Sequence, residues 1–379
     1  MLYYAAPMEG FTDRVWRQTH QKWFGAQGAA DRYYAPFISP PENRVLIKKK
    51  MAELAPAANP GASVIPQLLA KDGELAAWMI GQLRALGYTE VNLNLGCPAG
   101  TVTAKGKGSG MLRDPAKVDA FLDGVFSHAE GPVSVKTRLG VEKPEEFAAI
   151  LEIYNRYPIS ELTIHPRVMK QLYRGQADRE AFAAYLPACT APVCYNGDLF
   201  SVSDTERFLV EYPDADDLMF GRGMLIDPAL VMRLRAKSAD PAGKSAVKKL
   251  RLENKSTVWE DAAKRVSDIR DFYGRLAEDY AAVLSGERDV LFKMKELWSW
   301  QGQLFEGSEK YLKKIRKAQK LQNTSPQLRR CLQTVRSKTR EYRASKTAAS
   351  IDSRCCAPKS STPLKNRDRW KGTGRKGFS

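Results

Sequence analysis

The sequence predicts a (β/α)8 barrel, in which eight parallel strands alternate with helices. Eight short apolar or β-branched runs recur through the first 220 residues, and helix-like stretches lie between them. Alternation at this spacing over about 230 residues matches the usual size of such a barrel. Polar residues also gather where the runs end. A doubly wound sheet is the alternative that the same alternation allows.

The expected strands are short runs that end at turn residues or at polar residues. They cover 2–6, 33–37, 63–68, 90–95, 132–137, 161–165, 192–196 and 217–221. The clearest helices between them cover 73–86, 115–128, 144–157, 201–212 and 228–236, and several begin with Asp or Ser and Pro in capping positions. The link over 40–60 is the least regular part. All eight strands precede Ala236, which predicts a barrel that is complete without the rest of the chain.

Polar and glycine residues follow nearly every expected strand. In a (β/α)8 barrel the active site lies at the carboxyl ends of the strands, so these residues should meet. Glycines there allow backbone amides to approach a phosphate closely. In chain order the residues are Pro7, Met8, Glu9, Gln67, Asn94, Cys97, Lys136, Arg138, His165, Arg167, Asn196, Gly197, Asp198, Gly221, Arg222 and Gly223.

The run over 90–112, EVNLNLGCPAGTVTAKGKGSGML, is where we expect the chemistry. Its apolar residues alternate with Asn residues, as in a strand. Gly96 and Pro98, on either side of Cys97, end this strand. Lys105 and Lys107 follow among glycines, and this pattern predicts a mobile basic lid. If Cys97 were considered without the other motifs, the better interpretation would be a buried cysteine at the end of a strand, followed by a solvated loop of Lys and Gly.

The net positive charge of the chain comes entirely from its last part. Residues 1–236 hold 26 Lys and Arg against 27 Asp and Glu, whereas residues 237–379 hold 34 against 16. A near-neutral first part and a basic second part predict catalysis in one and binding of a polyanion, such as nucleic acid, in the other. No apolar run reaches membrane-span length and no signal peptide is evident, so we expect a cytoplasmic protein.

The six cysteines show no paired CxxC spacing, which indicates neither a metal site nor a disulfide framework. We expect reduced thiols and a monomer. The predicted domains are a barrel over 1–238, a Lys-rich linker over 239–256, a helical domain over 257–323 and a disordered basic tail over 324–379. Within the helical domain, apolar positions three or four apart predict helices over 259–284, 290–305 and 308–321. Lysines on their opposite faces, including Lys293, are candidates for phosphate contacts.

Together these motifs resemble the tRNA-dihydrouridine synthase family, flavoenzymes that reduce uridine in tRNA. APMEGFTD, the strand with Gln67, NLNLGCPAGTVTAKGKGSGML, VKTRLG, IHPR, YNGD and GRG occur in family order and spacing over residues 1 to about 236. The resemblance continues less distinctly through DVLFKMKELW to about Leu321, where the family has a helical tRNA-binding domain. The basic tail departs from the family pattern.

The resemblance implies FMN as cofactor, NADPH as reductant, and tRNA as partner. It implies that FMN is held by Pro7, Met8, Glu9, Gln67, Lys136, His165, Asn196, Gly197, Asp198, Gly221, Arg222 and Gly223. Cys97 would donate a proton to the uracil ring, since a thiol remains mostly protonated at neutral pH. Asn94, Lys105, Arg138 and Arg167 are candidates for contacting the uridine or its phosphate. The alternatives are a flavin-dependent reductase of free pyrimidines and a non-catalytic RNA-binding barrel.

Overall fold

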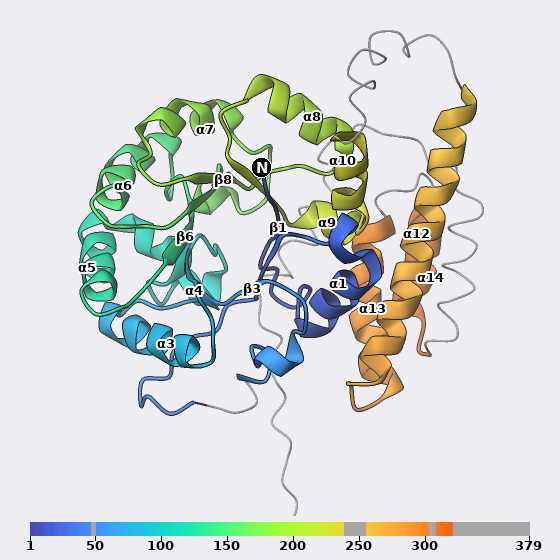
Figure 1. The fold of residues 1–379 in the computed structure, drawn as a ribbon, viewed down its shortest axis with the longest axis horizontal. Helices are drawn as coiled ribbons and strands as arrows, with labels where there is room; N and C mark the ends of the chain where they lie inside the picture. The colour runs from blue at the N-terminus through green and yellow to red at the C-terminus, as the bar shows by residue number, and fades with distance from the viewer. Residues whose placement is uncertain (47–50, 239–254, 303–307, 321–379) are drawn as a thin grey trace, which may run out of the picture.

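The computed structural model describes residues 1–46, 51–238, 255–302 and 308–320. The predicted tail over 324–379 and nearly all of the predicted linker therefore lie outside the described residues. The described part forms a ring of helices around parallel strands, with three further helices against one side of the ring (Figure 1).

All eight predicted strands are present and every pairing between them is parallel. The strands are β1 (Tyr3–Ala5), β2 (Arg32–Tyr34), β3 (Val64–Ile65), β4 (Gln67–Leu68), β5 (Val91–Leu95), β6 (Val133–Arg138), β7 (Leu162–His165), β8 (Val193–Tyr195) and β9 (Asp217–Phe220). Strands β3 and β4 are two halves of one run, divided at Pro66, which has no N–H to donate. Because β3 pairs with β2 and β4 with β5, the ring closes as a (β/α)8 barrel.

The surrounding helices begin where the sequence offers capping side chains. Asp13, Asp72, Asp114, Asp178 and Ser201 each accept a backbone N–H in the first turn of the helix that follows. The helices around the barrel are α1 (Arg14–Gly28), α3 (Gly73–Ala85), α5 (Pro115–Phe126), α6 (Phe147–Tyr154), α7 (Arg179–Tyr185), α8 (Val202–Glu211), α9 (Arg222–Ile226) and α10 (Leu230–Ser238). Helices α1, α7 and α9 are additional to those that the sequence made clearest.

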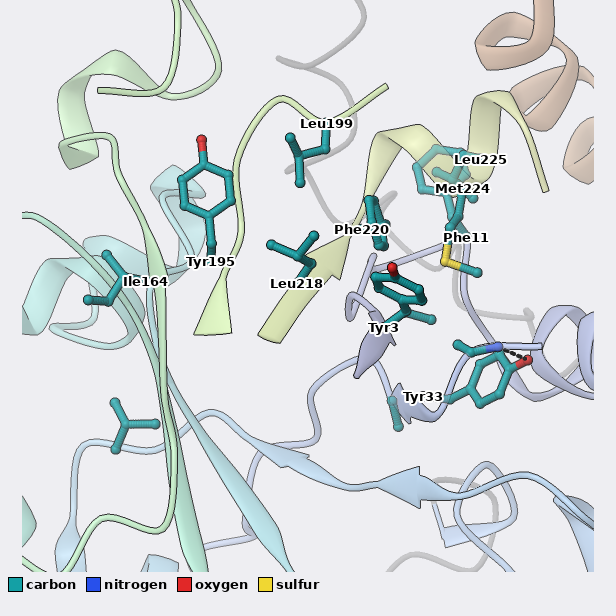
Figure 2. Packing of buried hydrophobic residues seen from close by; sticks show 14 of the residues in the cluster. Tyr3, Phe11, Tyr33, Ile164, Tyr195, Leu199, Leu218, Phe220, Met224 and Leu225 are labelled. Carbon is teal, nitrogen blue, oxygen red and sulfur yellow. Dashed lines mark hydrogen bonds between the residues drawn. The ribbon is translucent and has the colours of Figure 1, made fainter. Parts of the chain in front are cut away.

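Alternation along the strands separates an apolar outer face from an inner face that is partly polar. Ile164, Tyr195, Leu218 and Phe220 belong to the large apolar cluster between the strands and the helices (Figure 2). The neighbouring positions point into the barrel, and several of them are polar, such as Asn92, which is completely buried. The inside of this barrel therefore combines hydrogen-bonded polar side chains with a small apolar cluster that includes Ile65, Cys194 and Met219.

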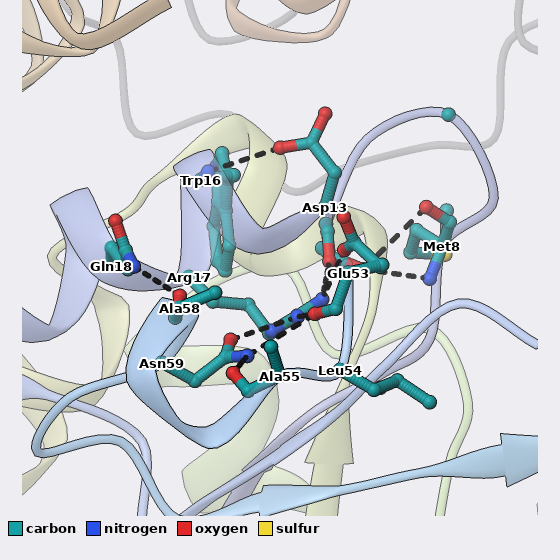
Figure 3. A network of polar contacts seen from close by, with 12 residues as sticks. Met8, Asp13, Trp16, Arg17, Gln18, Glu53, Leu54, Ala55, Ala58 and Asn59 are labelled. Carbon is teal, nitrogen blue, oxygen red and sulfur yellow. Dashed lines mark hydrogen bonds and ion pairs between the residues drawn. The ribbon is translucent and has the colours of Figure 1, made fainter. Parts of the chain in front are cut away.

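Arg17 of α1 holds the irregular link between β2 and β3 in place (Figure 3). Its fully buried guanidinium donates to the carboxylate of Glu53 at 2.9 Å and to Oδ1 of Asn59 at 2.9 Å. It also donates to the carbonyl oxygen of Thr12 at 2.8 Å, and the Thr12 hydroxyl accepts the Met8 N–H at 2.9 Å. One cation thus joins the link, helix α1 and the loop after β1.

Three helices follow the barrel: α12 (Lys255–Ala281), α13 (Glu287–Gln301) and α14 (Glu309–Lys317). They agree in position with the three that the sequence predicts. Phe272 of α12 lies 5.5 Å from Phe24 and 6.5 Å from Trp16, both on α1, measured between ring centroids. The Tyr273 hydroxyl donates to the carbonyl oxygen of Leu225 at 2.6 Å. These helices and the barrel therefore share one apolar core. None of the described helices is long and apolar enough to span a membrane.

Candidate active site

A hollow lies at the carboxyl ends of the strands, where a (β/α)8 barrel has its active site. Residues of β6, β7 and β9 line it, together with residues that follow β1, β7, β8 and β9. Ten were predicted from the sequence: Pro7, Met8, Lys136, His165, Asn196, Gly197, Asp198, Gly221, Arg222 and Gly223. Sequence reasoning missed Ala6, Tyr173, Leu199, Phe200, Met219 and Phe220. Most of these directly adjoin predicted residues, whereas Tyr173 lies further along its loop.

Two residues predicted for the same site do not line the hollow. Glu9 is exposed on the loop after β1. Gln67 is buried in the barrel, where its amide bonds to Asn92 and Asn94. Their assignment to the cofactor remains a prediction.

Lys136 brings a cation to the hollow from β6. Among the residues that the structure describes, its ammonium has no hydrogen-bond or ion-pair partner. Burial, together with the positive charge of Arg138, lowers the pKa of Lys136 to about 7. A lysine in this state gains its charge readily when an anion binds beside it.

His165, at the end of β7, is neutral and its tautomer follows from its neighbour. Burial, followed by the charges of Arg138 and Arg167, holds the pKa of His165 well below its usual value. Arg167 Nη1 lies 3.0 Å from Nε2 of His165, and an arginine can only donate, so Nε2 accepts and the ring proton is on Nδ1. Within the described chain Nδ1 has no partner, which leaves a donor for a ligand.

Asp198 holds together two arginines of the site. Arg167 donates to its two oxygens at 3.0 and 2.5 Å, and Arg222 donates to one of them at 2.6 Å. Burial alone would raise the pKa of Asp198, but the two guanidinium groups outweigh it and hold the pKa below the usual value. With Lys136 protonated, one carboxylate stands against several cations, so the hollow is suited to an anion.

Aromatic rings and a close backbone contact keep Arg222 in place. Its guanidinium carbon lies 5.1 Å from the ring centroid of Tyr173 and 5.2 Å from that of Phe200. A Cβ at Gly223 would lie 2.2 Å from the carbonyl oxygen of Leu199. The loop after β8 can therefore pack on the start of α9 only because residue 223 is glycine.

Cys97 lies in the loop after β5 and is anchored by its backbone. Its N–H donates to Oδ1 of Asn94 at 2.8 Å, and its carbonyl oxygen accepts from the Ser109 N–H at 3.0 Å and hydroxyl at 2.9 Å. The thiol is half-buried, and burial raises the pKa of Cys97. The group therefore stays protonated at neutral pH. The positive charges of Arg138 and Lys136 oppose this rise in the pKa of Cys97 without cancelling it.

Arg138 and Arg167, predicted for the substrate, are almost fully buried and bonded within the protein. Arg138 donates to the carbonyl oxygens of Gly96 at 2.9 Å and Leu172 at 2.7 Å, and its guanidinium carbon lies 5.3 Å from the Tyr173 ring centroid. Arg167 bonds to His165 and Asp198 as described. This geometry favours a role in holding the site loops.

A family model described as dihydrouridine synthase (Dus) matches residues 4–350. The chain belongs to the dihydrouridine synthase family. The tRNA-dihydrouridine synthase resemblance read from the motifs is thereby confirmed.

Individual relatives agree with this family. The chain is 33% identical over 231 residues to Probable tRNA-dihydrouridine synthase 1 of Synechocystis sp., covering 60% of this chain and 62% of the relative. It is 30% identical over 218 residues to tRNA-dihydrouridine synthase B of Pseudomonas aeruginosa, covering 57% and 64%. The match thus spans a little under two thirds of these relatives. Among solved structures, morphinone reductase aligns with 64% of this chain and 88% of its own, at 15% identity and a TM-score of 0.43.

In this dihydrouridine synthase family member the expected lid is a folded segment. Residues after Cys97 form the short helix α4 (Gly100–Thr103) and the 3-10 helix η2 (Gly108–Arg113), whose Met111 and Leu112 are buried. Lys105 is exposed at the tip between them. Of the four predicted substrate residues, Lys105 alone presents its charge to solvent.

The outer face of α14 carries the basic surface of the helical part. Tyr311, Leu312 and Ile315 are buried against the other helices. The exposed side carries Lys310, Lys313, Lys314, Arg316 and Lys317. No ion pair neutralises these five within the described residues, so the face is available to a polyanion.

Proposed function

We propose that this protein binds FMN in the barrel hollow and uses NADPH to reduce specific uridines in tRNA to 5,6-dihydrouridine. Membership of the dihydrouridine synthase family and the names of the relatives support the substrate. The observation that carries the cofactor is Lys136, which lines the hollow beside further cations and has no partner among the residues that the structure describes.

The residues of the hollow fit FMN in its three parts. Arg222 and the glycine backbone at Gly221 and Gly223 suit a phosphate dianion. The Nδ1–H of His165 and the ammonium of Lys136 suit the polar edge of an isoalloxazine ring, whose reduced anion a cation stabilises. Pro7 and Met8 offer apolar surface for the ring itself. Bound reduced FMN would supply the hydride for one carbon of the uracil C5=C6 bond.

Cys97 is the proposed donor of the proton for the other carbon. A general acid must be protonated when it acts, and burial keeps the Cys97 thiol in that form. Its peptide is fixed at both the N–H and the carbonyl oxygen, so the thiol is delivered at a constant place. Positioning of this kind supplies much of the advantage of an enzymatic acid.

The uridine must leave the tRNA fold before it can reach the hollow, which costs a few kcal/mol. Phosphate contacts can offset this cost, because they position the RNA independently of its sequence. We assign these contacts to the basic face of α14, defined by its five exposed cations, and to Lys105 at the rim of the barrel. Base contacts within the barrel would then select uridine.

The test is to incubate the purified full-length protein with an unmodified tRNA transcript and NADPH, and to measure dihydrouridine by mass spectrometry. We expect a yellow protein, dihydrouridine at defined positions, and less product with NADH. Turnover on free uracil or orotate without need for tRNA would instead establish a pyrimidine reductase. A colourless protein that binds tRNA would establish a non-catalytic RNA-binding barrel.

A further inference from the structure

A chain of hydrogen bonds crosses the inside of the barrel and ends at the backbone of Cys97. It begins at Glu90, immediately before β5. The Ser134 hydroxyl on β6 donates to Oε1 of Glu90 at 2.6 Å, and Nδ2 of Asn92 donates to the Ser134 hydroxyl at 3.0 Å. Nε2 of Gln67 on β4 then donates to Oδ1 of Asn92 at 2.7 Å.

The upper half of the chain continues through a second asparagine. Nδ2 of Asn94 donates to Oε1 of Gln67 at 2.8 Å. Oδ1 of Asn94 accepts the N–H of Gly96 at 3.1 Å and that of Cys97 at 2.8 Å. Strand register explains the lower contacts, because Asn92 lies opposite both Gln67 on β4 and Ser134 on β6.

The direction of every bond in the chain is dictated by its two ends. Glu90 forms an ion pair with Arg32 at 3.2 Å, and a carboxylate can only accept hydrogen bonds. At the other end, the N–H groups of Gly96 and Cys97 can only donate. Each side-chain amide between these ends therefore has one orientation in which all its contacts are satisfied.

Because the hydrogen-bonded side chains are buried, a change in the orientation of one amide affects its neighbours. Asn92 and Ser134 are 0% exposed and Gln67 is 1% exposed. Water cannot replace a lost partner at such positions, so a reversed amide leaves buried donors or acceptors unpaired. A change at Ser134 is therefore transmitted to Asn94 through three hydrogen bonds, which join Ser134 to Asn92, Asn92 to Gln67 and Gln67 to Asn94.

We propose that Ser134 and Asn92 are positioning residues for Cys97, acting through the amides of Gln67 and Asn94. Neither lines the hollow, so their effect is indirect. They orient Asn94, and Asn94 holds the loop that carries the thiol. The catalytic importance of that placement rests on the proposed function, whereas the placement itself is a property of the fold.

The experiment compares Ser134→Ala and Ser134→Thr with the parent protein. Ser160→Ala is the matched control, because the Ser160 hydroxyl is buried and has no hydrogen-bond partner in the described part of the chain. Two readouts are needed: the rate at which iodoacetamide alkylates Cys97, located by mass spectrometry, and kcat and KM for dihydrouridine formation on a tRNA transcript. Melting temperature and flavin content report whether each variant is folded.

We expect Ser134→Ala to alkylate about threefold to tenfold faster at Cys97, the range that one lost buried hydrogen bond corresponds to. Its kcat should fall by a similar factor with an unchanged KM for tRNA, and Ser134→Thr should restore both. An alkylation rate equal to that of the parent in a folded Ser134→Ala protein would overturn the proposal. An equal effect from Ser160→Ala would do the same. If the parent forms no dihydrouridine, the proposed function fails while the alkylation rates still decide the placement.

Discussion

The ammonium of Lys293 on α13 lies 2.5 Å from a carboxylate oxygen of Asp13, the residue that caps α1. It also donates to the carbonyl oxygen of Gly10 at 2.7 Å. The Tyr280 hydroxyl of α12 donates to the other Asp13 oxygen at 2.8 Å. Lys293 was a candidate for a phosphate contact, yet here its charge joins the helical part to the loop after β1. That loop carries Met8, which lines the hollow.

Lys293→Met should therefore weaken the barrel rather than the contact with RNA. Asp13 would keep Tyr280 but lose its cation, and we expect the free energy of unfolding to fall by about 1 kcal/mol, with weaker FMN binding. Lys313→Met on the exposed side of α14 is the control and should leave both unchanged. Denaturant titration and flavin fluorescence measure the two effects. Equal stability of the two variants would show that the Lys293–Asp13 contact adds nothing.

FMN affinity should depend on pH through Lys136. Its pKa of about 7 in the protein lies below the usual value near 10.4, and a bound anion favours the charged form. The protein must then take up a proton on binding above pH 7, so affinity should fall as pH rises from about 7 to 9. Lys136→Arg stays charged and should lose this dependence, and Lys136→Met should bind weakly throughout. Fluorescence titrations with FMN over this pH range measure the affinities. The same pH dependence in the parent and both variants would contradict the assignment of Lys136 to the FMN site.

Removal of the Cys97 thiol should separate reduction of the flavin from reduction of the uridine. Cys97→Ala should keep its FMN and its oxidation of NADPH but form dihydrouridine at least about 100-fold more slowly, the lower range for loss of a general acid. Cys189→Ala is the control, since that half-buried thiol donates to the Tyr185 carbonyl away from the hollow. Near-normal product from the Cys97 variant at neutral pH would remove this residue from the mechanism.

The pH dependence of the parent protein is a second test of Cys97 as the proton donor. Because burial raises the pKa of Cys97, the acid form should persist beyond the ordinary cysteine value near 8.5 and be lost only at higher pH. Single-turnover product formation at saturating FMN should therefore hold up to about pH 8.5. A decline that begins near neutral pH would indicate another acid.

Neutralising the basic face of α14 should weaken tRNA binding in a salt-dependent way. Lys313→Gln and Lys317→Gln should each reduce the slope of log affinity against log salt by about 1 if each cation meets one phosphate. Lys117→Gln on α5 is a charge-matched control, because that lysine is 76% exposed on the outside of the barrel. Affinities measured over a potassium chloride series give the slopes. Slopes that match the control would place the RNA elsewhere.

The sequence alone was sufficient for the barrel and for much of the hollow. Strand period, capping residues and glycine turns are local signals, so the eight strands and helices such as α3 and α5 could be located without tertiary information. Barrel geometry then brings the residues after each strand together, which is why Lys136, His165 and Arg222 meet as predicted. The family motifs consist of the same residues.

Only the tertiary structure decided which of these side chains already have hydrogen-bond or ion-pair partners within the protein. Tyr173 and Asp198, which contact the arginines of the site, lie on separate loops. No local sequence pattern indicates that Asp198 would bind both Arg167 and Arg222. All eight strands precede Ala236, yet Phe272 and Tyr273, which lie beyond it in the sequence, cover α1 and α9. The prediction that the barrel is complete without the rest of the chain therefore missed this shared core. The physical reason is that hydrogen bonding and burial depend on distance in space, whereas sequence patterns report only the neighbours along the chain.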